Sequence, residues 1–311
     1  MADRPADSAL ASATPFPAAS VIVSSRNRQK LLTDAVQSVL EGDRVPAEIV
    51  IIDQSDREDL VLAGLRSDRG CEIRYRWHQS VGVSRGRNEG IAAAKHDCLV
   101  FIDDDLRVSR SWLGTLVGAL ERFGSCAVVT GRVETLAEQP GGFQLATKVE
   151  DNPALFRGRV GKDVLFSGNM AMFRSAICHI GDFDEALGPG TPFPGGEDND
   201  LGYRLLEAGY SIAYVPEAVV YHREWRSKRD YLPMRWKYGL GRGGFYAKHT
   251  NLRDGYMLRR MLRDVRSHVL ACRAEVIGNR RRGLGHLTLA AGILVGFGRW
   301  GLQLGVNSSA K

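Results

Sequence analysis

Short apolar segments alternate with helical segments between residues 20 and 123, and this alternation restricts the fold more than any other feature. Four segments have the length and the β-branched or apolar content of buried strands: 20–25, 47–53, 72–78 and 98–103. A helical pattern follows each of these strands: 30–40, 59–66, 84–95 and 109–123. We expect a serine to cap the start of the last helix. Strands that alternate with helices build βαβ units. The sequence therefore predicts an α/β fold with a Rossmann-like, mostly parallel central sheet flanked by helices.

The pattern is less regular after residue 126. Residues 126–134 and 211–222 are typical of strands, and the segment 163–177 predicts two strands that meet near Ser167. A loop rich in glycine and proline then leads into a helix that begins near Glu197. We therefore divide the chain into a disordered lead-in, one α/β domain and a basic helical C-terminal region: 1–19, 20–222 and 223–311.

Charge is divided unevenly along the chain. Residues 223–311 contain 19 basic and 5 acidic residues, a net charge of +14, which leaves −8 for residues 1–222. Such a basic segment suggests an anionic partner, either a membrane surface, a phosphorylated substrate or nucleic acid. The five cysteines are an odd number with no C-x-x-C pair, and the N-terminus lacks the apolar stretch of a signal peptide. We therefore expect a cytoplasmic protein without disulfides or structural zinc.

Three aspartates in succession, Asp103, Asp104 and Asp105, stand where the fourth predicted strand ends. Helix capping explains this cluster poorly, because one cap needs one carboxylate. Ser24 and Asp53 also end predicted strands, and the carboxyl ends of parallel strands meet at the edge where α/β sheets bind ligands. Carboxylate oxygens suit Mg²⁺ or Mn²⁺, which take further ligands from phosphate and water. The sequence therefore predicts a divalent-metal and phosphate site at this edge.

A second acidic pair, Glu197 and Asp198, begins the helix that follows the glycine-rich loop. A carboxylate at this position could reach into the same cleft and act as a general base. The alternative is that these charges only complement the dipole of the helix.

Seven segments together resemble the family 2 glycosyltransferases with the GT-A fold. They occur in the family's order and cover about residues 20–222: "VIVSSRNR", "EIVIIDQSD", "GVSRGRNEGIAAAKHDCLVFIDDD", "SGNMAMFR", "GDFDEALG", "GGEDNDLGYRLLEAGY" and "YVPEAVVYH". The resemblance implies metal-dependent transfer of a sugar from a nucleotide-diphosphate sugar to an acceptor hydroxyl. It also implies inversion at the anomeric carbon through one direct displacement.

The resemblance assigns donor-binding roles to matching positions. It places the loop after the first strand against the nucleotide, with Ser24, Arg26 and Asn27. It assigns Asp53 to the base or ribose. The segment "RGRNEG" supplies the last two donor contacts, Arg87 and Asn88, which would face the nucleotide and diphosphate.

The resemblance also assigns the metal site and the base. Asp103 and Asp104 would lie on the ribose side of the D-x-D motif, and Asp103 and Asp105 would bind Mn²⁺ or Mg²⁺. Asp198 would deprotonate the acceptor hydroxyl, next to Glu197. His222 ends the last predicted strand, where some members of the family have an additional metal ligand. A structural histidine is the alternative.

The basic C-terminal region departs from this resemblance. "LPMRWKYG" (232–239) is similar to the Q-x-x-R-W signature of processive synthases, but Leu232 replaces the glutamine, which argues against processive synthesis. "YGLGRGG" (238–244) is either a phosphate-facing loop or a simple turn. Residues 256–277 predict a basic amphipathic helix, and the apolar segment 287–297 is too short to span a bilayer. We expect a peripheral contact with the inner face of the cell membrane and a lipid-linked or envelope-glycan acceptor. The alternatives are packing on the catalytic domain or a homodimer contact.

Two other functions remain open at this point. A sugar nucleotidyltransferase also combines an α/β sheet with metal-binding carboxylates, but we expect glycines after its first strand, and "SSRNRQK" has none. A non-enzymatic protein that binds nucleic acid or membranes would use the basic region. Motifs for nucleic-acid recognition are missing, so we expect no nucleic-acid partner.

Overall fold

The computed structural model describes residues 17–136, 148–223, 227–251 and 253–308. The predicted lead-in therefore lies almost wholly outside the described residues. The four strands predicted in the first half are confirmed: β1 (Ala19–Ser25), β2 (Glu48–Asp53), β3 (Glu72–Trp77) and β4 (Cys98–Asp103). They pair in parallel in the order β3-β2-β1-β4, so that Ser24 of β1 lies beside Asp103 of β4. The carboxyl ends of these strands thus meet at one edge, as the sequence predicts.

The second half extends the same sheet with strands of mixed direction. Its strands are β5 (Leu106–Val108), β6 (Ala127–Leu136), β7 (Ala154–Phe156), β8 (Asn169–Phe173) and β9 (Ser211–Arg223). Strand β8 is antiparallel to both β4 and β6, whereas β6 and β9 run parallel. The long strand β9 also pairs with β5 and β7 in antiparallel register. Consequently His222, near the end of β9, pairs with Leu106, one residue after the aspartate cluster.

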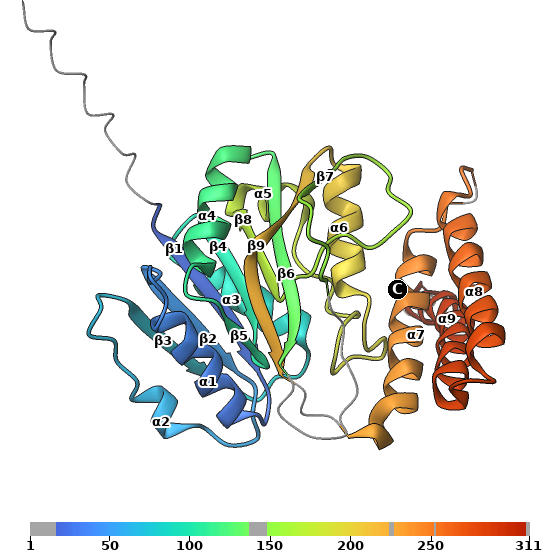
Figure 1. Ribbon diagram of the computed structural model, residues 1–311, viewed down its shortest axis with the longest axis horizontal. Coiled ribbons are helices and arrows are strands. Elements are labelled where there is room, and N and C mark those ends of the chain that lie inside the picture. Colours follow the sequence, from blue (N-terminus) through green and yellow to red (C-terminus); the bar gives the residue numbers. More distant parts are fainter. Residues whose placement is uncertain (1–16, 137–147, 224–226, 252, 309–311) are drawn as a thin grey trace, which may run out of the picture.

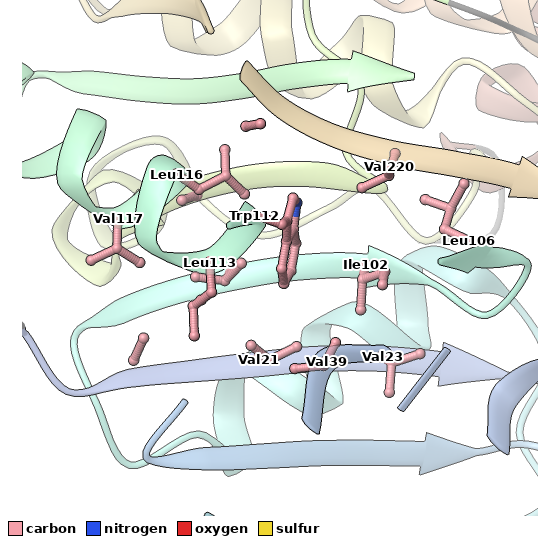
Figure 2. Close-up of a cluster of buried hydrophobic side chains, with 14 of the residues drawn as sticks. Val21, Val23, Val39, Ile102, Leu106, Trp112, Leu113, Leu116, Val117 and Val220 are labelled. Carbon is pink, nitrogen blue, oxygen red and sulfur yellow. The ribbon is translucent and has the colours of Figure 1, made fainter. Parts of the chain in front are cut away.

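Helices cover both faces of the sheet because its central strands are apolar on both sides. On one face lie α1 (Gln29–Leu40), α2 (Leu60–Ala63) and α4 (Trp112–Phe123). On the other lie α3 (Val83–Ala93), α5 (Arg174–Ile180) and α6 (Glu197–Glu207). Figure 2 shows Trp112 pointing from α4 into the first cluster, among Ile102 and Val220. The indole N–H of Trp112 donates to Asn169 Oδ1 at 2.8 Å, so this large buried side chain leaves no polar atom unsatisfied.

Several local predictions need correction. Residues 163–168 form a loop, and only one strand, β8, follows it before the helix α5. This helix begins at Arg174, whose guanidinium donates to the carbonyls of Ile91, Ala94 and His96 at the end of α3 and just after it. The helix predicted over 59–66 is only one turn long, α2. Helix α4 begins at Trp112, and Ser111 at its N-cap forms no side-chain capping bond.

The C-terminal region is helical, as expected, and packs beside α6 at one side of the sheet (Figure 1). A short 3₁₀ turn (Lys228–Asp230) precedes α7 (Tyr231–Lys248), α8 (Tyr256–Glu275) and α9 (Arg280–Ser308). Phe245 of α7 and Ile293 of α9 are fully buried in the cluster that joins these helices to Tyr203 of α6. Within the described residues, no helix is long and apolar enough to cross a membrane.

Glycines let α7 and α9 approach each other closely. A Cβ atom on Gly243 would lie 2.6 Å from the amide nitrogen of Phe297 and would also collide with the carbonyl of Ile293. Gly239 faces Gly292 in the same way. The segment "YGLGRGG" is therefore the helix interior at a tight packing seam, which corrects the expectation of a loop or turn. The segment 287–297 lies within α9, with its buried positions on this seam.

Candidate active site

A cleft of about 610 Å³ opens at the carboxyl edge of the sheet. The β1–α1 loop, the β4–β5 turn, the loop before α6 and the C-terminal helices all contribute to its walls. Ten of the predicted site residues line it: Ser24, Arg26, Asn27, Arg87, Asp103, Asp104, Asp105, Glu197, Asp198 and His222. Two acidic segments more than 90 residues apart in the chain therefore face one cavity.

The three aspartates have different surroundings. Asp104 is buried, and its carboxylate accepts hydrogen bonds from the Ser25 hydroxyl at 2.6 Å and from Arg28 at 2.8 Å. Burial and the neighbouring Asp105 raise the pKa of Asp104 to about 7, although Arg28 and Ser25 oppose this shift. Asp103 instead accepts from Arg87 at 2.7 Å. Asp104 is thus tied to the β1–α1 loop, and Asp105 also lies within 3.6 Å of Arg28, whereas Asp103 pairs with Arg87.

Asp105 and His222 form the pair best suited to a metal. Asp105 Oδ1 lies 3.8 Å from His222 Nε2, and both side chains line the cleft. Among the described residues, no three His, Cys, Asp or Glu side chains converge as a ligand group. One carboxylate and one imidazole fit Mn²⁺ or Mg²⁺ when phosphate and water complete the shell. Asp103, the third expected ligand, is paired with Arg87 in this arrangement, and its role as a metal ligand stays a prediction.

Arg87 connects the two acidic segments. Its guanidinium is buried, with Nη2 on Asp103 and Nη1 at 3.8 Å from Glu197 Oε1 and 3.7 Å from Asp198 Oδ1. Nη1 has no hydrogen-bond acceptor within the part of the chain that the structure describes. The guanidinium also stacks on Phe183, 5.2 Å from the ring centroid. One buried cation therefore neutralises part of three carboxylates.

Glu197 and Asp198 occupy the first turn of α6. Gly196 enters the helix with φ of +86°, and a Cβ there would lie 2.6 Å from the carbonyl of Gly241 in α7. Burial and Asp198 raise the pKa of Glu197 to about 7, against the opposing charge of Arg87. Burial also raises the pKa of Asp198, while Arg87 and the hydroxyl of Ser167, which donates to Asp198, lower it. A carboxyl pair held in this way is well placed for proton transfer near neutral pH.

The β1–α1 loop is held against the β2 loop. Asn27 has a left-handed φ of 56°, and its side-chain amide and Asp56 exchange hydrogen bonds of 3.0 Å. Arg26 also donates to Asp56, at 3.2 Å. Ser24 packs against Gly86 of α3, where a Cβ would lie 2.7 Å from the serine Cβ. These contacts fix a polar loop at the rim of the cleft.

Two predicted donor contacts lie outside the lining of the cleft. Asp53 is fully buried, and its carboxylate accepts from the Tyr75 hydroxyl at 2.7 Å and the Ser55 amide at 2.9 Å. Asn88 points about 100° away from Arg87 around α3. Its side-chain amide donates to the Phe183 carbonyl at 2.9 Å and accepts from the Phe183 amide at 3.0 Å. The contact predicted between Asn88 and the diphosphate stays a prediction. The binding of the base or ribose by Asp53 likewise stays a prediction.

The sequence reasoning missed part of the cleft. It did not single out Arg28, which forms ion pairs with Asp104 and Asp105, or Ser167, which binds Asp198. It noted the segments 232–239 and 238–244 but did not place their residues in the wall that the C-terminal helices form: Arg235, Tyr238 and Arg242 of α7 and Leu289 of α9. The spacing of the first three is the only available signal, since positions i, i+3 and i+7 share one face of a helix.

The chain is similar to known proteins both in sequence and in fold. The pre-mycofactocin glycosyltransferase of Mycobacterium tuberculosis is 30% identical over 244 residues, which cover 74% of this chain and 48% of that protein. The chain thus spans about half the length of this relative. A mannosyltransferase from Pyrobaculum calidifontis, solved with GDP-Man and Mn²⁺, has a TM-score of 0.58 at 16% identity and covers 90% of this chain and 88% of its own.

A second solved structure is similar to a comparable extent. Staphylococcus aureus TarS 1–349, in complex with UDP-GlcNAc, has a TM-score of 0.54 at 14% identity, covering 89% of this chain and 90% of its own. A likeness over nine-tenths of the chain extends beyond the α/β domain into the C-terminal helices. The sequence profile of "Glycosyl transferase family 2" matches residues 20–180, more than half of the chain. With this match and the GT-A-type sheet around the cleft, the chain belongs to glycosyl transferase family 2.

Proposed function

We propose that this protein transfers a sugar from a nucleotide-diphosphate sugar to an acceptor hydroxyl, with inversion and with the help of Mn²⁺ or Mg²⁺. The main support is the pairing of two acidic segments across one cleft through Arg87. Membership of the family favours glycosyl transfer over the nucleotidyltransferase and nucleic-acid alternatives. The match covers 48% of the relative from Mycobacterium tuberculosis, and the donor, the acceptor and the partners of this chain are identified by the experiments below.

The donor end of the cleft has two parts. Ser24, Arg26 and Asn27 would contact the nucleotide, and Asp103 would contact the ribose side. Asp105 and His222 would hold the metal, which when bound offsets the negative charge of the departing diphosphate. The imidazole of His222 favours Mn²⁺ over Mg²⁺. The complexes with GDP-Man and with UDP-GlcNAc support donors of this class without selecting a nucleotide.

The other end of the cleft would activate the acceptor. Asp198 takes the proton of the acceptor hydroxyl while that oxygen bonds to the anomeric carbon. The bond between this carbon and the diphosphate oxygen breaks in the same step, so the configuration inverts. Ser167 and Arg87 orient the Asp198 carboxylate and favour its charged form. Glu197, with a pKa near 7, would keep the total negative charge of the pair low in the free enzyme.

The metal assignment is tested by donor turnover. A thermal-shift screen of UDP-, GDP- and dTDP-sugars with Mn²⁺ first identifies the donor. Asp105→Ala should then abolish metal-stimulated transfer or hydrolysis of that donor. Asp97→Ala is the matched control, because the Asp97 side chain is 88% exposed and lies just before β4. Full activity of the wild-type protein in excess chelator would show that the metal assignment is wrong.

The C-terminal helices suggest a lipid-linked acceptor at an anionic membrane surface. Two adjoining helices present exposed apolar side chains, which we call the docking face: Leu262, Val269, Leu270 and Ile277 at α8, and Leu284, Leu287, Leu294, Val295 and Leu302 on α9. Exposed arginines accompany them: Arg259, Arg263, Arg266, Arg273, Arg280, Arg281 and Arg282. Apolar residues mixed with arginine are typical of helices that lie in a membrane interface.

Vesicles that contain phosphatidylglycerol should therefore bind the protein. Binding should weaken with salt, since each basic residue near the surface contributes about 1 kcal/mol, but an apolar part should remain. Leu294→Glu on the docking face should remove that part, whereas Leu60→Glu on α2, where Leu60 is 75% exposed, should not. Absence of binding at low salt contradicts this proposal. Light scattering that detects a dimer disrupted by Leu294→Glu would then assign the face to a second copy of the chain.

A further inference from the structure

Five arginines line the cleft: Arg26, Arg28, Arg87, Arg235 and Arg242. Arg235 differs from the rest in its partners. Each of the other four forms an ion pair with at least one aspartate. Arg242, for example, pairs with both Asp163 and Asp264. Arg235 forms no ion pair with any described residue, and its hydrogen bonds go to neutral groups. Within the described part of the chain, it is therefore the cleft arginine without a direct carboxylate partner.

The neutral partners of Arg235 lie on α9. Its Nε donates to the carbonyl of Gly285 at 3.3 Å, and its Nη2 lies 3.5 Å from His286 Nδ1. Burial lowers the pKa of Arg235, and the more distant charges of Asp264 and Glu275 oppose this shift only in part. These two long contacts hold the guanidinium in place and leave most of its donors available. A half-buried cation of this kind is stabilised when an anion binds beside it.

The position of Arg235 associates it with the acceptor end of the cleft. It shares one face of α7 with Tyr238, whose Cα lies 3.5 Å from where a Cβ of Gly195 would be. Gly195 and Gly196 lead directly into Glu197 and Asp198. The metal pair, in contrast, comes from the β4–β5 turn and the end of β9. Arg235 therefore belongs to the wall that supports the base.

We propose that Arg235 binds an anionic oxygen group of the acceptor, a phosphoryl or a carboxylate group that lies near the hydroxyl to be glycosylated. This inference rests on the proposed function, since it assumes that the acceptor enters beside Asp198. The planar guanidinium can offer two parallel N–H donors to either group. An acceptor without such an anion would leave the half-buried guanidinium of Arg235 without an anionic partner, so the site selects for anionic acceptors.

The test uses the full-length protein saturated with Mn²⁺ and with the nucleoside diphosphate that corresponds to the donor found by the thermal-shift screen. Calorimetry then measures the binding of inorganic phosphate and, separately, of acetate. Nucleotide fills the diphosphate site, so any further anion must bind elsewhere. Phosphate binding alone assigns a phosphoryl group, whereas acetate binding assigns a carboxylate. Either result supports the inference.

Arg235→Ala should weaken this anion binding by about 10- to 100-fold, the range expected for a lost charge-assisted hydrogen bond. Arg235→Lys should restore part of it, and Lys237→Ala is the control, because Lys237 is exposed on the same helix. The dissociation constant of the nucleotide should change less than twofold in all three variants. The inference is overturned if the loaded protein binds neither anion, or if Arg235→Ala weakens nucleotide binding and leaves anion binding unchanged. Failure of every nucleotide to bind would instead refute the proposed function itself.

Discussion

Replacement of Arg87 by methionine should shift the pH dependence of catalysis, because this arginine is the charge that opposes burial at Asp198. Burial raises the pKa of Asp198, and Arg87 lowers it from a distance of 3.7 Å. In Arg87→Met the pKa of Asp198 rises further, so less of the base is ionised at pH 7. Raising the pH restores the ionised form, and activity should recover with it.

The size of the loss follows from the distance. Two unit charges about 4 Å apart interact by about 4 kcal/mol at an effective dielectric constant of about 20. Because about 1.4 kcal/mol corresponds to a factor of ten, this energy sets an upper limit of about 10³ on the fall in ionised Asp198. Water that enters the space left by the guanidinium reduces the effect. We therefore expect kcat/KM at pH 7 to fall by about 10²–10³.

The assay is the pH profile of kcat/KM between about pH 6 and pH 9, measured with the donor dissociation constant at each pH. Arg85→Met is the matched control, because Arg85 lies on the same helix, is 48% exposed and pairs with the exposed Glu185. Circular dichroism verifies that each variant folds, since breaking a buried ion pair costs about 3–5 kcal/mol of stability. An equal loss of activity at every pH, matched by weaker donor binding, would refute the role of Arg87 in ionising the base.

Two further predictions concern stability. Gly243→Ala should lower the free energy of unfolding by about 1–3 kcal/mol, because its Cβ would lie 2.6 Å from the amide nitrogen of Phe297. Gly298→Ala, which meets nothing within 4 Å, should be neutral or stabilising by up to about 1 kcal/mol, and urea unfolding compares the two. Equal effects would contradict the packing seam. Burial alone would raise the pKa of Asp200, but His249, Arg204 and Lys248 outweigh it and hold that pKa well below its ordinary value. Stability from Asp200 is therefore present above about pH 4 and lost below it, so Asp200→Asn should cost about 3 kcal/mol at pH 7 and less at pH 3. A cost independent of pH would show that the charge of Asp200 is not what stabilises the fold.

The parallel half of the fold follows from the sequence because its signals are local. In β1, Val21 and Val23 pack on one face of the sheet and Ile22 on the other, which is why the strand is continuously apolar. The same regularity places Ser24 beside Asp103 at the strand ends. Segment 163–177 misled because β-branched and aromatic residues there pack as a buried loop, with Val164 and Leu165 in the core.

The site was predictable where residues follow strand ends and unpredictable where distant segments meet. Asp103 ends β4 and Asp105 follows two residues later, at the edge of the sheet where the sequence pattern predicts them. Arg28, by contrast, precedes a helix in an ordinary polar run, and its pairing with Asp104 spans 76 residues of sequence. Arg235 lies in the cleft only because the glycines of α7 allow that helix to pack against Gly195 and Gly196. Tertiary packing of this kind has no local signal.

The apolar pattern of α8 shows the same limit. Leu258, Leu262, Val265 and Val269 share a helical face in the sequence, but the buried side of α8 is centred on Met257 and Met261. Leu262 and Val269 are 53% and 40% exposed. Periodicity predicts that a helix has an apolar side, whereas the neighbouring helices decide which part of that side is covered.

The central claim is that Asp198 is the base that activates the acceptor, and turnover of Asp198→Asn tests it most directly. Asparagine keeps the shape of the side chain and cannot take the proton. We predict that kcat falls by about 10²–10⁴ while the donor dissociation constant stays within about twofold of wild type. Glu197→Gln, one residue earlier on the same helix turn, should lose less. Turnover close to wild type in Asp198→Asn, or a loss explained wholly by weaker donor binding, would contradict the account.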